Sequence, residues 1–333
     1  MADVRRAVLA VLLVTLSALP AVAAPAGLCD ATRGDAAPVV LVVSAFPAEG
    51  APLRAAGTFD TPVVVQSRSF FPGVLEGVRV VIGLTGIGMV NAAATTEAAI
   101  AQFDPIAIVM SGVAGSSHRI ADVVVASHWV EPPKKRRIPV NAAMLALARR
   151  GAAALPEPLE HCATVPPGSA TGALVCMPFE PEVAFADLGQ TSDPYGGTAV
   201  QCTPNGGVLF GCDIPAPAVR AAAAATPEVE DMETGEVARI AKKHGIPFVA
   251  MRAVSDGAGD PLGDRGFPAQ FFDYYQLSAD NAAIATRGLL KEVARLAQDA
   301  GAKRTCTLLA RRRWTAAAKR LRPPSASTTA ASQ

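Results

Sequence analysis

The chain has 333 residues, of which 50% are hydrophobic and 18% charged, and its formal net charge is +1. This length is enough for a buried core in one large domain or two smaller ones. The near-zero net charge gives no indication of a nucleic-acid-binding protein, and we expect no nucleic acid partner.

The N-terminus has the features of a secretory signal peptide. Arg5 and Arg6 precede a short apolar stretch at 7–19, and a small-x-small sequence at 21–23 follows it. The stretch is shorter than the roughly 20 residues of a membrane-spanning helix. We expect residues 1–23 to be removed, giving a secreted or periplasmic protein without stable membrane insertion; an uncleaved anchor helix is the alternative.

The body of the chain alternates predicted strands and helices. Apolar runs rich in β-branched residues predict strands covered on both faces, at residues 38–45, 78–84, 106–111, 122–127 and 247–254. Ala-rich segments between them predict helices, at residues 89–103, at residues 232–244, and from a capping Ser278 to about residue 300. This alternation indicates an α/β domain over 36–302: a three-layer α/β/α sandwich around a central mixed, largely parallel sheet.

Residues 151–220 differ from the rest of this domain. They are rich in Pro and Gly and hold four of the six cysteines, namely Cys162, Cys176, Cys202 and Cys212. We interpret them as a disulfide-stapled insertion and expect these four to pair largely among themselves, although six cysteines allow 15 pairings. Without a CxxC or CxxH spacing, no metal site is expected.

The C-terminal residues 303–333 form a predicted tail. Residues 303–322 carry eight Lys or Arg and no acid, and a low-complexity stretch follows. We interpret the tail as a solvated terminus; binding to an anionic surface is the alternative.

Polar groups with catalytic potential come from three separate places. Glu49 follows the first predicted strand, Asp231-Met232-Glu233 opens a predicted helix, and the segment 252–256 ends the last strand. Glycine-rich turns at 85–88 (TGIG) and 111–115 (SGVAG) follow two other strands. Ligands usually bind at the carboxyl ends of strands in an open α/β sheet, although each piece alone could be an ordinary loop or helix-cap feature.

Taken in order, these segments resemble the nucleoside phosphorylase and methylthioadenosine/S-adenosylhomocysteine nucleosidase superfamily. The resemblance lies in VVLVVSAFPAEGAPL, VVIGLTGIGMVNAA, IVMSGVAGSSHRIADVVVAS and EDMETGEVARIAKKHGIPFVAMRAVSDGAG, and covers about 39–130 and 228–300. The exported context and the long insertion also look like plant vegetative and bark storage proteins, which share this fold.

The resemblance implies cleavage of the bond between a purine and ribose, without metal or cofactor. This reaction needs an acid at the leaving base and a base that activates water beneath C1′. Glu49 matches the general base that activates water. Asp256 matches the acid that engages purine N7, and Ser255 orients it.

The same resemblance implies a set of substrate-binding residues. Glu233 matches the carboxylate that binds the ribose hydroxyls, and Met232 packs against the ribose. Gly115 lies in the turn that approaches the nucleoside, and Arg252 supports the acidic cluster. The family also implies a homo-oligomer, with a dimer favoured, in which a neighbour closes the 5′ side of the pocket.

The sequence departs from the family pattern near these residues. Residues 46–48 (Phe-Pro-Ala) replace an acidic run, Val113 replaces a hydroxyl residue, and Asp231 replaces a glutamate. The base-stacking loop is expected near residues 210–217. These changes affect the expected substrate more than the reaction type.

Three functions remain open from the sequence. The first is hydrolysis of a purine nucleoside like 5′-methylthioadenosine or S-adenosylhomocysteine. The second is phosphorolysis, which needs cations around a phosphate, yet neither glycine turn contains one and Glu49 would repel the anion. The third is a non-catalytic nucleoside-binding or storage role on the same fold.

Overall fold

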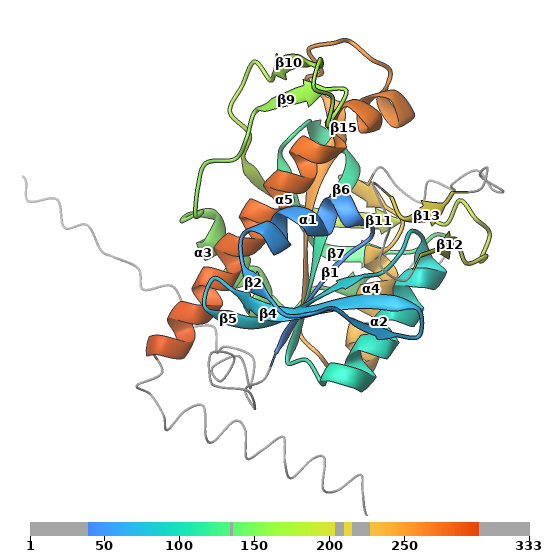
Figure 1. Ribbon diagram of the computed structural model, residues 1–333, viewed down its shortest axis with the longest axis vertical. Coiled ribbons are helices and arrows are strands. Elements are labelled where there is room, and N and C mark those ends of the chain that lie inside the picture. Colours follow the sequence, from blue (N-terminus) through green and yellow to red (C-terminus); the bar gives the residue numbers. More distant parts are fainter. Residues whose placement is uncertain (1–38, 134–135, 204–209, 215–226, 300–333) are drawn as a thin grey trace, which may run out of the picture.

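The computed structural model describes residues 39–133, 136–203, 210–214 and 227–299 (Figure 1). The predicted signal peptide and basic tail lie outside these ranges. The described helices are α1 (Pro47–Ala55), α2 (Met89–Phe103), α3 (Ala142–Ala152), α4 (Thr234–His244) and α5 (Gly266–Asp299). The described strands are β1 (Val40–Ser44), β2 (Thr58–Phe59), β3 (Val63–Val65), β4 (Arg68–Leu75), β5 (Val78–Leu84), β6 (Ala107–Arg119), β7 (Val123–Val130), β8 (Ile138–Pro139), β9 (Cys162–Val165), β10 (Ala173–Cys176), β11 (Val183–Thr191), β12 (Gln201–Cys202), β13 (Cys212–Asp213), β14 (Val229–Asp231) and β15 (Phe248–Ala258).

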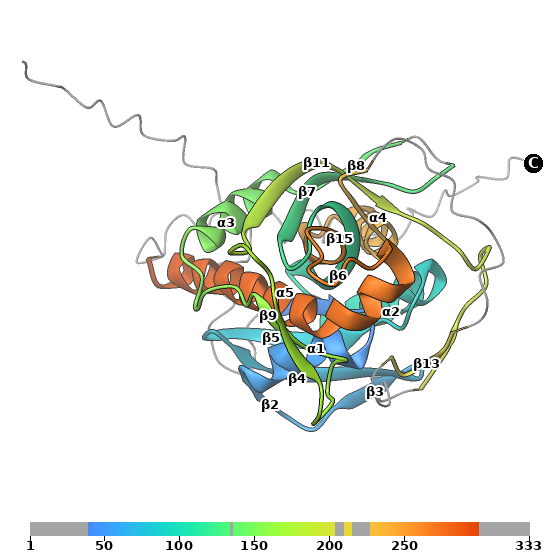
Figure 2. The same cartoon turned by 90° about the horizontal axis from the view of Figure 1, so that it is seen from above.

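One large sheet organises the molecule. Its strand order is β14-β11-β7-β15-β6-β1-β5-β4-β2. The pairings of β1 with β5 and β6, of β6 with β15, and of β11 with β7 and β14 are parallel, whereas β4 and β5 are antiparallel. Because β14 also pairs with β6, five of the strands close into a ring, which Figure 2 shows from above. The prediction of a mixed, largely parallel central sheet is confirmed.

Helices cover the sheet on two sides. Helices α1 and α3 pack against the long α5, and α2 packs against α4 elsewhere on the sheet (Figures 1 and 2). Every residue of β1 is buried, which explains its uninterrupted apolar sequence. The predicted strand at 78–84 and helix at 89–103 are confirmed with the same bounds, as β5 and α2.

The prediction that Ser278 caps the last helix is wrong. Helix α5 begins at Gly266, so Ser278 lies inside it, fully buried. Its hydroxyl donates a hydrogen bond to the Val254 carbonyl, 2.7 Å away, and therefore ties α5 to β15 rather than satisfying a helix end. The apolar side chains of its C-terminal half face the core: Ile284, Leu289 and Val293 are buried, and Leu296 packs against them partly buried.

The cysteine-rich segment 151–220 is partly peripheral and partly central. Cys162 pairs with Cys176 across the β9–β10 hairpin, and Cys202 pairs with Cys212 across β12–β13, so these four cysteines pair among themselves as predicted. Between the two hairpins, however, β11 joins the central sheet beside β7 and β14. The segment thus contributes one strand to the core.

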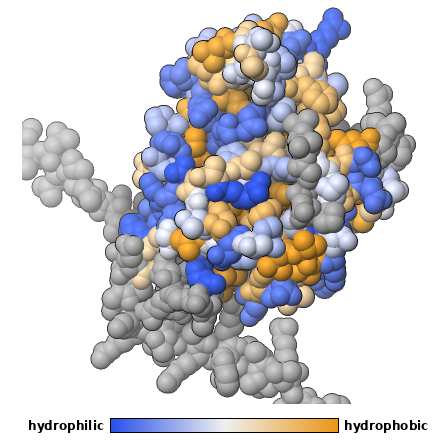
Figure 3. Space-filling model, viewed as in Figure 1, coloured by the Kyte–Doolittle hydropathy of each residue, from blue (hydrophilic) through white to orange (hydrophobic). Residues whose placement is uncertain are grey.

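The surface seen in Figure 3 mixes polar and apolar side chains. Several large apolar side chains are exposed, among them Phe267 and Phe272 at the start of α5. Within the described ranges, no helix is both long enough and apolar enough to cross a membrane.

Candidate active site

The structure places all seven predicted site residues around one cavity. The cavity has a volume of about 800 Å³ and lies beyond the end of β1, against β14 and the C-terminal halves of β6 and β15. Its lining includes the seven residues predicted from the sequence, which are Glu49, Gly115, Met232, Glu233, Arg252, Ser255 and Asp256. Segments more than 200 residues apart in the sequence therefore meet at one place, as the order of the motifs predicts.

An arginine lies at the centre of three carboxylates at one end of this cavity. Arg252 is 1% exposed. Its Nε lies 3.1 Å from Asp231 Oδ2, its Nη2 lies 3.4 Å from Glu233 Oε2, and its Nη1 lies 4.0 Å from Glu49 Oε1. One guanidinium cannot neutralise three ionised carboxylates, so this buried cluster favours retaining a proton on at least one of them.

Glu49 is held by backbone groups as well as by this cluster. It lies in the first turn of α1, where the Ala45 N–H donates to Oε2 at 2.5 Å and the Val113 N–H donates to Oε1 at 2.7 Å. Gly112 makes room for it, because a Cβ at that position would collide with the carboxylate. Burial raises the pKa of Glu49, although Arg252 and the two N–H groups oppose that shift. The result is a fixed carboxylate with an increased tendency to take up a proton.

Glu233 is the second carboxylate of the cluster that faces the cavity. The Gly88 N–H donates to its Oε1 at 2.8 Å, and Gly88 adopts φ +92°, a conformation that glycine tolerates. Burial raises the pKa of Glu233 to about 8, with the nearby charges of Asp231 and Glu49 acting in the same direction and Arg252 against it. The TGIG turn therefore fixes this acid.

Asp231 anchors the cluster to the sheet. Its carboxylate accepts hydrogen bonds from the hydroxyls of Thr191 on β11, at 2.6 Å, and Thr234 on α4. The N–H groups of Glu233 and Thr234 also point to Asp231 Oδ1. The shorter acid at this position, a departure from the family pattern, is therefore fully engaged by hydroxyl, backbone and guanidinium groups.

Asp256 occupies the other end of the cavity with Ser255 and Gly115. The Ser255 hydroxyl donates to Asp256 Oδ1 at 2.9 Å. Burial raises the pKa of Asp256, an effect that the Ser255 hydrogen bond opposes and the charge of Glu230 reinforces. A Cβ on Gly115 would lie 2.6 Å from Asp256 Oδ2, so the missing side chain of this glycine makes room for the carboxylate.

An aromatic wall closes another side of the cavity, and of its residues only Phe210, at the start of the expected base-stacking loop, was predicted from the sequence. Phe46 and Phe271 both contact Phe210, at ring centroid distances of 5.2 and 5.7 Å. Phe272 and Phe267, both largely exposed, continue the wall toward the rim. In the sequence, Phe46 stands out only as a departure from the family pattern. The high proportion of aromatic residues at 267–275 was the signal that could have indicated this wall.

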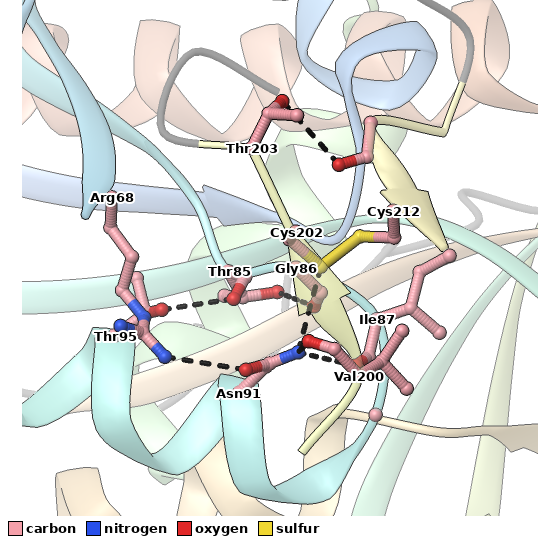
Figure 4. The surroundings of a disulfide bond; sticks show 12 residues. Arg68, Thr85, Gly86, Ile87, Asn91, Thr95, Val200, Cys202, Thr203 and Cys212 are labelled. Carbon is pink, nitrogen blue, oxygen red and sulfur yellow. Dashed lines mark hydrogen bonds between the residues drawn. A yellow bond between two sulfur atoms is a disulfide. The ribbon is translucent and has the colours of Figure 1, made fainter. Parts of the chain in front are cut away.

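The second disulfide, between Cys202 and Cys212, lies against a glycine turn (Figure 4). Asn91 Nδ2 donates to the Val200 carbonyl at 2.7 Å and lies 3.6 Å from Cys202 Sγ. A Cβ on Gly86 would come within 2.8 Å of the same sulfur. The Cys202–Cys212 hairpin therefore rests on the turn that fixes Glu233, and Phe210 lies two residues before Cys212.

A group of potential metal ligands lies away from the cavity. His161, Cys162 and Cys176 have side-chain donor atoms within 4.8 Å of one another. Both sulfurs are joined in a disulfide, so neither is a thiolate, which is the form that binds metals. The trio is a poor metal site.

The chain is similar in sequence to several known proteins. The sequence model of the phosphorylase superfamily matches residues 39–178. An uncharacterised protein of Mycobacterium tuberculosis is 37% identical over 186 residues, which cover 51% of this chain and 74% of that protein. The 5′-methylthioadenosine/S-adenosylhomocysteine nucleosidase of Marinomonas sp. is 27% identical over 257 residues, covering 76% of this chain and 98% of the relative.

A solved structure shares the fold. The 5′-methylthioadenosine/S-adenosylhomocysteine nucleosidase of Neisseria meningitidis, in complex with methylthio-immucillin-A, aligns with a TM-score of 0.53 at 21% identity. The alignment covers 76% of this chain and 98% of that one. This structural likeness shows the fold, and the sequence matches show that the chain belongs to the phosphorylase superfamily.

Proposed function

We propose that the protein hydrolyses the N-glycosidic bond of purine nucleosides. The observation that carries this proposal is that Glu49, Glu233 and Asp256 line one cavity, each with its pKa raised by burial. Acids and bases with pKa values moved toward neutrality suit proton transfer near pH 7. The name of the Marinomonas relative supports the same reaction.

In this proposal the two ends of the cavity carry opposite proton transfers. Protonated Asp256 donates to purine N7 while the bond between C1′ and N9 breaks, so the base leaves as a neutral species. A water molecule beneath C1′ gives one proton to Glu49 and forms the new C–O bond. The ribose becomes cation-like in between, and the negative cluster around Arg252 stabilises that charge.

Glu233 binds the sugar in this scheme. One of its oxygens accepts the Gly88 N–H, and the other lies 3.4 Å from Arg252 Nη2. The carboxylate lines the cavity, where it would accept hydrogen bonds from the ribose hydroxyls. Met232, half-buried beside it, would pack against the ribose ring.

The charges around the cavity favour water over phosphate as the attacking group. Among the described lining residues, Arg252 is the only Lys or Arg. It faces three carboxylates, so no cation is left for a phosphate dianion, which Glu49 would also repel. Phosphorolysis is therefore the weaker alternative.

The aromatic wall suggests the kind of 5′ substituent. Phe46, Phe210 and Phe271 offer an apolar surface near the first strand end. An apolar thioether, as in 5′-methylthioadenosine, would pack against such a surface with little desolvation cost. We propose that the substrate carries such a group, and that a neighbouring subunit of a dimer completes this side.

The two disulfides within the described residues are consistent with an oxidising compartment. Together with the signal-like N-terminus, they support a secreted or periplasmic location for the protein.

The decisive experiment is incubation of the purified protein with methylthioadenosine, adenosine and inosine, with and without phosphate. We expect free base to appear at equal rates in both conditions, and the Glu49→Gln protein, as a matched control, to release none. A strict requirement for phosphate would show phosphorolysis. Binding without turnover of any nucleoside would point to the storage or binding role.

A further inference from the structure

A second carboxylate lies at the same end of the cavity as Asp256 and has no part in the mechanism above. Glu230, on β14, lines the cavity together with Ser192, Gly115 and Asp256. Its negative charge is close enough to raise the pKa of Asp256. Glu230 is not among the site residues that the family resemblance implies, so its position in the cavity requires a separate explanation.

Strand register places Glu230 opposite Asp256 across a glycine. Glu230 pairs with Gly115 of β6, and Gly115 pairs on its other side with Asp256 of β15. Directly paired residues direct their side chains to the same face of a regular sheet. The register of β15 against β6 shifts on either side of Asp256, yet both acids line the same cavity. Two strand spacings, roughly 10 Å, therefore separate the backbones that carry the two acids, and the Asp256 carboxylate lies over Gly115, on the side of Asp256 that faces Glu230.

Neighbouring polar groups hold the Glu230 side chain in place. Ser192 Oγ and Gln190 Nε2, the latter at 3.1 Å, both donate to Glu230 Oε1. Gln190 is also the partner of Glu230 in the β11–β14 ladder. Within the described part of the chain, no hydrogen-bond donor reaches Oε2, so this oxygen is an acceptor that a ligand can use.

We propose that Glu230 determines the base specificity of the cavity, by accepting a hydrogen bond from N1–H of a 6-oxopurine. This inference rests on the proposed function, in which Asp256 engages N7 on the five-membered ring. The six-membered ring then points across Gly115 toward Glu230. An ionised carboxylate only accepts hydrogen bonds, so the base edge that faces it must donate.

Purines differ at this edge. Hypoxanthine carries a proton on N1, and guanine carries one on N1 and two more on its 2-amino group. Adenine presents a lone pair at N1, which would face the lone pairs of Glu230. A buried acceptor without a donor is costly, and that cost lowers the rate for the wrong base. The cavity is therefore expected to select inosine-type or guanosine-type nucleosides over adenosine-type ones, whatever their 5′ substituent.

The test compares kcat/KM for two matched pairs: inosine with adenosine, and 5′-methylthioinosine with 5′-methylthioadenosine. We expect the native protein to favour the 6-oxopurine of each pair by about tenfold or more. Glu230→Gln keeps the size of the side chain but supplies an amide N–H that can donate to adenine N1. The preference should therefore move toward adenine by about the same factor.

Glu228→Gln is the matched control, because Glu228 lies two residues away and outside the cavity lining, where it accepts the Asp187 N–H at 2.8 Å. It should leave the preference unchanged. A Glu230→Gln protein with the same preference as the native one would overturn the proposal, as would a native preference for adenine that survives the substitution.

Failure of the proposed function can be distinguished from failure of this inference by measuring binding. If no nucleoside is cleaved, calorimetric titration with hypoxanthine, guanine and adenine tests Glu230 without any reaction. Tighter binding of the two oxopurines, lost in Glu230→Gln, would still support its role in base selection. Equal affinities for all three bases would refute it.

Discussion

The two ends of the cavity handle negative charge in different ways. At one end, Glu49, Asp231 and Glu233 are each 6% exposed or less and share a buried arginine. At the other end, Asp256 is only half-buried, and its hydrogen-bond donor is the neutral Ser255 hydroxyl. Burial raises the pKa of Glu49, Glu233 and Asp256, but Arg252 opposes this effect only at the first end.

This difference suggests how one fold can hold both a base and an acid. A carboxylate beside a guanidinium can stay ionised and still take up a proton when a cation-like sugar forms next to it. A carboxyl group without a cation retains its proton more easily and can donate it. Pairs of titratable groups in contrasting environments are a common basis for acid–base assignment.

The largest expected effect is the loss of activity when the acid Asp256 is replaced. Asp256→Asn keeps the shape but removes the proton that the carboxyl group donates. Hydrolysis should fall by a factor of about 10²–10⁴, the usual contribution of a positioned acid or base, while the thermal unfolding midpoint stays close to that of the native protein. Activity close to that of the native protein would show that Asp256 is not the acid.

The next largest effect distinguishes the roles of the two carboxylates, Glu49 and Glu233, at the end of the cavity that holds Arg252. Measured above pH 8, where Glu233 is ionised, Glu233→Gln should weaken nucleoside binding by roughly 10–150-fold, the equivalent of one charge-assisted hydrogen-bond interaction. Glu49→Gln should abolish turnover yet leave ground-state binding intact, because Glu49 acts on water. Calorimetric titration of both proteins with a non-hydrolysable nucleoside analogue measures the difference. Equal losses of affinity would contradict the division of roles.

A pH titration sharpens the comparison further. Because the folded protein raises the pKa of Glu233 from 4.5 to about 8, the native state binds this proton more tightly than the unfolded chain does. The resulting stabilisation is fully present below pH 4.5 and is lost as the pH rises through about 8. The unfolding midpoint of Glu233→Gln should therefore depend less on pH across this window. An unchanged pH dependence would mean that another group titrates.

The smallest expected effect concerns the aromatic wall. Replacing both Cys202 and Cys212 by Ala should loosen the hairpin that carries Phe210 and raise KM for nucleosides with apolar 5′ groups. The charge cluster should remain intact, so kcat should change little. The matched control removes Cys162 and Cys176, which lie on the separate β9–β10 hairpin.

Thiol titration tests both disulfides directly. Cys162, Cys176, Cys202 and Cys212 should be unreactive in the native protein, and free thiols at these positions would contradict both disulfides.

Sequence patterns predicted the framework because the framework depends on local properties. The continuous apolar sequence of β1 and β5 reflects burial on both faces, and the helix at 89–103 was predicted with its observed bounds. By contrast, β11 was not recognised, because five of its nine residues are only partly buried or exposed and its sequence lacks the long β-branched run of the other core strands. Its place in the sheet depends on the neighbouring β7 and β14.

By itself, the sequence determined which residues could form a site, since the seven residues named from the ordered motifs all belong to the cavity lining. Only the tertiary structure decided their surroundings. The arrangement of three carboxylates around Arg252 depends on strands and turns that are distant in the chain, and the raised pKa values arise from burial that no local pattern encodes. The position of Glu230 opposite Asp256 is likewise set by register across β14, β6 and β15, because register decides which side chains share a face.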